Sequence, residues 1–103
     1  MAKPNPAFFM FDTRITDPQA LVPYLEKVGP TIQAAGGRLI VQNDAAEVFE
    51  GQKPQGIVVI LQFDSMQAAR DWYLGDAYQQ ILPHRLAGAS ANAWLVEGLP
   101  LQA

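Results

Sequence analysis

The distribution of hydrophobic and polar positions along the chain predicts short strands and amphipathic helices. Residues 7–13 and 57–63 form almost continuous apolar runs, which are typical of strands buried on both faces. Residues 38–42 and 93–97 are shorter runs of the same kind and predict two further strands. Residues 21–32 instead place apolar side chains three or four positions apart, which is the spacing of one helix face.

The first predicted helix carries start and stop signals. Asp17 can accept hydrogen bonds from the free amides of a first helical turn, and Pro18 fits the first helical position. Gly36 and Gly37 follow the last apolar position, and a glycine there can adopt the positive φ at which helices commonly end. Because Pro30 interrupts the stretch, we expect one bent helix over about residues 18–35.

A second helical region is predicted after the strand at 57–63. Asp64 or Ser65 can cap it, and the inward side of its first part is apolar. Gly75 ends this part, and a short continuation follows before a loop at 88–92. The side chains expected to point inward from the two parts are Met66, Ala69, Trp72, Tyr73, Tyr78, Ile81, Leu82 and Arg85.

In chain order, the predicted elements run β-α-β-β-α-β. This order is that of a ferredoxin-like βαββαβ sandwich, an α+β fold in which a four-stranded antiparallel sheet carries its helices on one face. We expect a single domain over residues 1–103, with its core over about 7–98. Residues 47–50 alternate polar and apolar side chains, so they are expected to extend the second strand as a bent or edge piece before a loop at 51–56.

The predicted sheet has two apolar faces, although the helices can cover only one of them. At about 25 cal/mol per Å² of apolar area, even a few hundred Å² left in water strongly favours association. The sequence therefore predicts a homodimer in which the uncovered sheet faces of two copies meet with two-fold symmetry.

Composition and charge exclude several classes of function. The chain is 50% hydrophobic and 17% charged, which is too apolar for a disordered protein. Seven basic and ten acidic residues give a net charge of −3, and the basic residues form no run or stripe, so we expect no nucleic-acid partner. The chain has no cysteine and a single histidine. Thiol catalysis, disulfides and the usual cysteine or multi-histidine metal sites are therefore excluded, and we expect no metal and no other cofactor.

The sequence also shows no targeting or membrane signal. The longest apolar run, residues 57–61, is far shorter than the roughly 20 residues of a membrane-spanning helix. The first six residues lack the apolar core of a signal peptide. We therefore expect a cytoplasmic protein with no membrane partner.

Several segments of the sequence are similar to a known family. They are residues 24–38, which end in Ala-Gly-Gly-Arg, and residues 48–51, 63–73 and 96–98. Together they resemble domain-of-unknown-function family thirteen-thirty, which belongs to the dimeric α/β-barrel group of ferredoxin-like proteins, over nearly the whole chain. The resemblance implies a dimeric α/β barrel, in which two sheets meet face to face. It implies no reaction, because the wider group includes cofactor-free monooxygenases, lactone isomerases and haem-binding enzymes.

Three positions bear on what the resemblance implies for a site. Asp64 stands where the family usually has proline, which should strengthen helix capping more than it alters a site. His84 falls where the family shows no fixed residue, whereas Arg85 matches a recurrent arginine. If the family shares a function, the resemblance favours Arg85 over His84.

The candidate site residues are polar and aromatic side chains expected between the helices and the sheet. Aromatic residues at helical spacing are usually core, but buried phenol hydroxyls need hydrogen-bond partners. If such groups converge with charged side chains, they form a small apolar pocket with a few polar handles, which is the usual form of a small-molecule site. The candidates are Tyr24, Trp72, Tyr73, Tyr78, His84 and Arg85.

Some of these residues have both a functional and a structural interpretation. His84 could act as a general base beside the cation Arg85, or could simply be exposed next to a loop. Arg85 and Tyr78 are the other candidate catalytic groups. Arg38 could hold an anionic ligand, or could pair with a carboxylate such as Glu50.

Two functions remain open. The first is a cofactor-free enzyme, monooxygenase- or isomerase-like, that acts on a small apolar or aromatic acid. Arg85 or Arg38 would hold the acid, and His84 or a tyrosine would move a proton. The alternative is a non-catalytic small-molecule-binding or stress-related module with the same pocket. An enzyme needs a base and an anchor in one cleft, whereas side chains that point separately into solvent would leave only a structural dimer.

Overall fold

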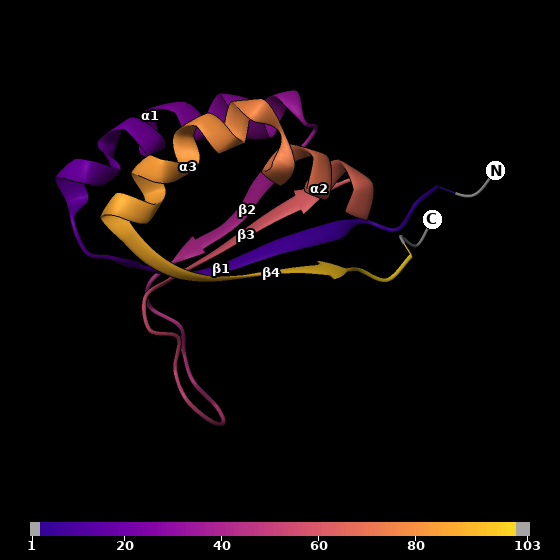
Figure 1. Cartoon of the computed structure of the whole chain (residues 1–103). Coiled ribbons are helices and arrows are strands. Elements are labelled where there is room, and N and C mark those ends of the chain that lie inside the picture. The colour runs from indigo at the N-terminus through magenta and orange to yellow at the C-terminus, as the bar shows by residue number, and fades with distance from the viewer. Residues whose placement is uncertain (1–2, 101–103) are drawn as a thin grey trace.

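The computed structural model describes residues 3–100 as two layers, a four-stranded sheet and three helices that cover one of its faces (Figure 1). The element order confirms the predicted β-α-β-β-α-β arrangement, with the second helical region divided in two. The elements are β1 (Ala7–Ile15), α1 (Pro18–Ala34), β2 (Arg38–Asn43), β3 (Ile57–Phe63), α2 (Met66–Leu74), α3 (Asp76–Gly88) and β4 (Ala89–Glu97).

The sheet is antiparallel throughout, with the strand order β2-β3-β1-β4. Strand β1 is therefore central, and its Phe9 lies opposite Leu61 on one side and Leu95 on the other. These three side chains pack into the core under the helices, whereas Met10, the next residue of β1, faces the other side of the sheet. The sheet order and the single helical layer confirm the predicted ferredoxin-like α+β fold.

Capping residues close in the chain set both ends of α1, as the sequence predicts. The Asp17 side chain accepts a hydrogen bond from the amide of Ala20 at 3.2 Å. Gly36, at φ +76°, takes the left-handed conformation that stops the helix. The helix continues through Pro30 as far as Ala34, so the predicted bounds are confirmed to within one residue.

The second helical region consists of two helices that meet at Gly75. Ser65 caps α2, because its hydroxyl accepts a hydrogen bond from the amide of Ala68 at 3.0 Å. The part after Gly75 is longer than predicted, since α3 continues through Pro83. No helix within residues 3–100 has the length and apolar character needed to cross a membrane.

The last strand begins earlier than predicted, so the loop expected over residues 88–92 is wrong. The carbonyl of Gly88 accepts hydrogen bonds from the amides of Thr16 and Asp17 at 2.9 and 3.0 Å. These contacts tie the end of α3 to the end of β1. As a result, β4 pairs with β1 from Ala89 onward.

The connection between β2 and β3 also departs from the sequence prediction. Residues 47–50 do not extend β2; they belong to an irregular segment, residues 44–56, that projects from the sheet on the side away from the helices (Figure 1). Strand β3 begins at Ile57, so residues beyond Asn43 have no strand beside them to pair with. The Asn43 side chain also accepts a hydrogen bond from the amide of Ala45 at 2.7 Å, which turns the chain. This segment is called the 44–56 arm below.

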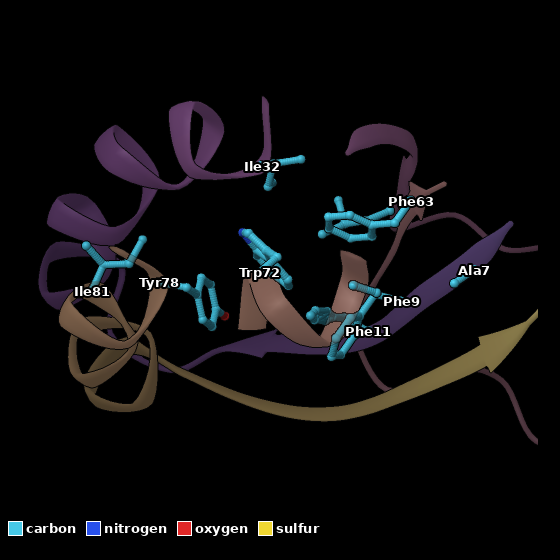
Figure 2. Close-up of a cluster of buried hydrophobic side chains, with 10 residues drawn as sticks. Ala7, Phe9, Phe11, Ile32, Phe63, Trp72, Tyr78 and Ile81 are labelled. Carbon is cyan, nitrogen blue, oxygen red and sulfur yellow. The ribbon is translucent and has the colours of Figure 1, made fainter. Parts of the chain in front are cut away.

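An aromatic cluster fills the space between the sheet and helices α2 and α3 (Figure 2). Trp72 lies within this cluster, with its ring centroid 4.2 Å from that of Tyr78 and 5.5 Å from those of Phe9 and Phe63. Tyr78 and Phe63 are fully buried. This part of the helix-covered face is therefore closed and forms the core of the domain.

The sheet face opposite the helices carries apolar side chains that remain accessible. Trp94 and Val96 of β4 are 51% and 45% exposed. Met10 and Ile60, which share this face, are partly exposed. The second apolar surface expected from the sequence is therefore present, and the association of two copies through it stays a prediction.

Candidate functional site

A pocket of about 230 Å³ lies between α1 and the sheet. Helix α1 packs mainly against α3, so space remains between its inner side and the strands. Leu25 of α1 and Leu39 of β2 line the pocket and are 57% and 52% exposed, so the pocket opens to solvent between these two elements. Its apolar lining consists of Phe11, Ile15, Leu21, Leu25, Val28, Ile32, Leu39, Ile57, Val59 and Leu61.

Four polar residues complete the lining, and they determine which ligands the pocket can hold. They are Thr13, Tyr24, Gln42 and Arg85. None of the lining residues is an aspartate, a glutamate or a histidine. In addition, no group of three or more potential metal-ligating side chains occurs in the part of the chain that the structure describes. The volume lies below the roughly 300–1,000 Å³ of drug-sized sites, so the pocket suits a small ligand.

Arg85 is the charged residue of the pocket. It projects inward from α3 and is only 8% exposed. Its guanidinium carbon lies 5.7 Å from the ring centroid of Phe11, within range of a cation–π contact. Its buried Nε has no hydrogen-bond partner among the described residues. A buried cation without an ionic partner is destabilising, so an anion in the pocket would be bound favourably.

A pair of tyrosines lies next to this charge. The hydroxyls of Tyr24 and Tyr78 are 2.9 Å apart and share a hydrogen bond. Burial is the main cause that raises the pKa of both phenols, and the nearby charge of Arg85 opposes this rise without cancelling it. Both phenols are therefore neutral near pH 7. They can donate hydrogen bonds, but neither can act as a phenolate base.

Trp72 and Tyr73 do not line the pocket and instead pack in the aromatic cluster around Tyr78. The Trp72 indole nitrogen donates a hydrogen bond to the Thr31 hydroxyl at 3.0 Å, which joins α2 to α1. The ring of Tyr73 stacks on that of Phe9 at 5.4 Å and lies 5.1 Å from that of Tyr78. These contacts fix the position of Tyr78 and hence of its hydroxyl.

The remaining predicted site residues do not line this pocket. His84 is exposed on the outer side of α3, although it is next to Arg85 in the chain. Arg38 is exposed at the start of β2, opposite Gln62 of β3. Glu50 is exposed in the 44–56 arm. The structure thus brings Arg85 and Tyr24 together in the pocket lining and leaves these three residues outside. Tyr78 is hydrogen-bonded to Tyr24 but is fully buried and does not itself line the pocket.

Two lining residues, Thr13 and Gln42, were not predicted from the sequence. Thr13 lies on the helix-facing side of β1, where alternation from Phe11 places it, so the periodicity could have revealed it. Gln42 could not be found in this way. The strand β2 contains an irregularity between Leu39 and Val41 that reverses the alternation of its faces.

The fold and the pocket together define a ferredoxin-like α+β protein with a small, mostly apolar pocket between its helices and its sheet. The chain belongs to the family described as Domain of unknown function (DUF1330), whose sequence model matches residues 6–99. The resemblance seen in the sequence is thereby confirmed. No curated protein shows significant similarity to the chain.

Solved structures with the same fold include oxygenases and proteins of unknown function. A protein of unknown function from Rhodopseudomonas palustris is 18% identical, with a TM-score of 0.73 over 94% of this chain and 85% of its own. SnoaB from Streptomyces nogalater, a cofactor-independent oxygenase, is 11% identical, with a TM-score of 0.65 over 94% and 96%. A Nitrosomonas europaea protein, named provisionally as an antibiotic biosynthesis monooxygenase, is 8% identical, with a TM-score of 0.59 over 96% and 95%. At these identities the similarity shows the fold alone.

Proposed function

We propose that this protein is a cofactor-free enzyme, monooxygenase- or isomerase-like, that binds a small apolar or aromatic acid as its anion in the pocket under α1. The observation that carries the proposal is Arg85, a buried cation whose Nε has no partner among the described residues, at a mostly apolar pocket. The fold shared with a cofactor-independent oxygenase supports the oxygenase-like side of the proposal.

The pocket supplies the charge stabilisation, but not the base, for a reaction that begins with the loss of a proton from the substrate. Both reaction types can start in this way, and the negative charge then resides on an oxygen as an enolate or phenolate. Because Arg85 already holds the carboxylate, it can stabilise the new charge only on the same oxygens, as in the enediolate formed by loss of the proton next to the carboxylate, and the neutral hydroxyl of Tyr24 can donate a hydrogen bond to them. The lining residues include no carboxylate or imidazole, so the enzymatic function requires a base from outside the lining, supplied through the open rim between α1 and β2.

The lack of a base among the lining residues also supports the alternative function. A pocket with an anchor and hydrogen-bond donors but no base of its own also suits a non-catalytic module that binds a small acid. The two functions differ in whether the bound acid is changed. An enzyme consumes the acid, with or without dioxygen uptake, whereas a binding module releases it unaltered.

Calorimetric titration with a charged and a neutral ligand of the same shape tests the shared claim. We expect phenylacetate to bind and phenylacetamide to bind much more weakly, because only the acid supplies a charge for Arg85. The variant Arg85→Met should weaken phenylacetate binding by about ten-fold or more, the usual contribution of a charge-assisted hydrogen bond.

Arg70 provides the matched control, since it is exposed on α2 and lines no pocket described above. Arg70→Met should bind phenylacetate as the unaltered protein does. Equal binding of the acid and the amide, or equal losses in the two arginine variants, would contradict the proposal.

A further inference from the structure

The irregularity in β2 determines which side chain this strand contributes to the pocket. Leu39 lies opposite Leu61, but the next aligned residue is Val41, opposite Ile60, so Ile40 is an extra residue in the strand. Regular alternation from Leu39 would turn Val41 toward the helices. The extra residue instead turns Gln42, which pairs with Val59, toward the pocket. The bulge thus places an amide where regular pairing would place a valine.

Gln42 lies at the opposite end of the pocket from Arg85. Gln42, Val59 and Phe11 form one row across the neighbouring strands β2, β3 and β1. The Arg85 guanidinium lies over the ring of Phe11. Since neighbouring strands are 4.7–4.9 Å apart, the backbone positions of Phe11 and Gln42 are separated by about 10 Å.

The part of the pocket between Arg85 and Gln42 is lined by apolar side chains. Val59 forms the floor, and Leu25 and Val28 of α1 line the pocket above the sheet. Thr13, the other polar residue of the floor, lies on β1 and therefore on the same side as Arg85. The amide of Gln42 is thus the polar group at the β2 end of the pocket, and it can both donate and accept a hydrogen bond.

We propose that the ligand carries one negative charge at one end and a neutral polar group at the other. This inference rests on the proposed function. The charged group of the ligand meets Arg85, its apolar body lies over Val59, and a neutral hydroxyl, carbonyl or amide at its far end forms a hydrogen bond with the Gln42 side chain. The far end is neutral because Arg85 is the only cation among the residues that line the pocket. A para-hydroxylated aromatic acid has this form, and a dicarboxylate does not.

The test compares 4-hydroxyphenylacetate with phenylacetate, which differ only in the far-end hydroxyl. The unaltered protein should bind the hydroxylated acid more tightly. Gln42→Leu should weaken the binding of that acid by about three- to ten-fold, the contribution of one neutral hydrogen bond, and should leave the binding of phenylacetate unchanged. Strand β2 is at the sheet edge and Gln42 is exposed, so the leucine should be tolerated. If it is not, Gln42→Met provides the same test.

Gln33→Leu is the control, because Gln33 is exposed on α1 and does not line the pocket. This variant should keep the preference for the hydroxylated acid. The proposal is overturned if the unaltered protein shows no preference, or if Gln42→Leu affects both acids equally or neither. In each of those cases, weaker binding of both acids by Arg85→Met would still support the proposed function. No response of either acid to Arg85→Met would overturn the proposed function itself.

Discussion

Arg85 and the tyrosine pair set the chemistry of the pocket, because burial affects charged and neutral groups differently. A guanidinium stays charged even when it is buried, so it favours a ligand that supplies negative charge. Burial has the opposite consequence for Tyr24 and Tyr78, whose pKa values it raises, so that both phenols remain neutral. The pocket therefore presents one fixed positive charge beside the neutral hydroxyl of Tyr24, which is hydrogen-bonded to that of Tyr78. This combination suits a single anionic group.

The tyrosine pair predicts a loss of stability at high pH. In the unfolded chain both phenols ionise with a pKa of about 10, whereas burial raises the pKa of both in the folded protein. Their contribution to the free energy of unfolding is complete below about pH 10. It decreases above that pH, because the unfolded state then releases protons that the folded state retains.

Urea unfolding at a series of pH values measures this contribution. Between about pH 9 and 11, the free energy of unfolding should fall less steeply in the double variant Tyr24→Phe with Tyr78→Phe than in the unaltered protein. Equal slopes would show that the two phenols ionise alike in the folded and unfolded states.

Among the elements, α1, β2 and β3 could be predicted closely, whereas the length of α3, the start of β4 and the 44–56 arm could not. Helix α1 begins and ends where Asp17 and Gly36 indicate, because capping depends on residues close together in the chain. The early start of β4 at Ala89 and the absence of a strand over residues 47–50 depend on which residues lie opposite in another strand. Sequence periodicity does not contain that information.

The candidate site also contains some residues that could be predicted from local spacing and one that depends on strand pairing. Arg85, Tyr24 and Tyr78 lie on helices whose inward faces could be predicted from spacing. Gln42 could not be found from alternation, because the β-bulge at Ile40 reverses the faces of the strand after Leu39. Local periodicity therefore revealed the charged end of the pocket, whereas its neutral end depends on the pairing between strands.

The junction between α1 and β2 gives a prediction at the scale of elements. A Cβ added at Gly37 would lie 2.6 Å from the Phe63 ring and 2.9 Å from the Ile32 side chain, both of which are buried. Gly37→Ala should therefore destabilise the protein by about 1–3 kcal/mol, the usual cost of overpacking.

Gly29→Ala is the matched control, because Gly29 lies within α1 and has no atom within 4 Å of an added Cβ. It should stabilise the helix by about 0.5–1 kcal/mol. Thermal and urea unfolding would measure both effects. Similar values for the two variants would show that Gly37 does not pack against Phe63 and Ile32 as described.

At the scale of the whole molecule, the uncovered sheet face remains to be explained. Trp94 and Val96 are about half exposed on it. The 44–56 arm projects from the same side of the sheet (Figure 1). Its Phe49 is 84% exposed. We propose that a second copy of the chain covers this face, because a contiguous apolar surface of this kind favours self-association.

Sedimentation equilibrium tests the homodimer. The protein should sediment at twice the 11.3 kDa mass of one chain, and Trp94→Glu should give single chains. Leu74→Glu is the control, since Leu74 is 69% exposed in the helical layer, and this variant should remain dimeric. A single 11.3 kDa species for the unaltered protein at micromolar concentration would contradict the homodimer.

Nitrogen-15 NMR of the arginine side chains tests the binding of an anion by Arg85 most directly. The chain has four arginines, Arg14, Arg38, Arg70 and Arg85, so the Nε–H signals are few, and the signal absent from Arg85→Lys identifies Arg85. On titration with phenylacetate, the Arg85 signal should shift and saturate while the other three remain in place. If the Arg85 signal does not move while phenylacetate binds, the anion lies elsewhere and the proposed site is wrong.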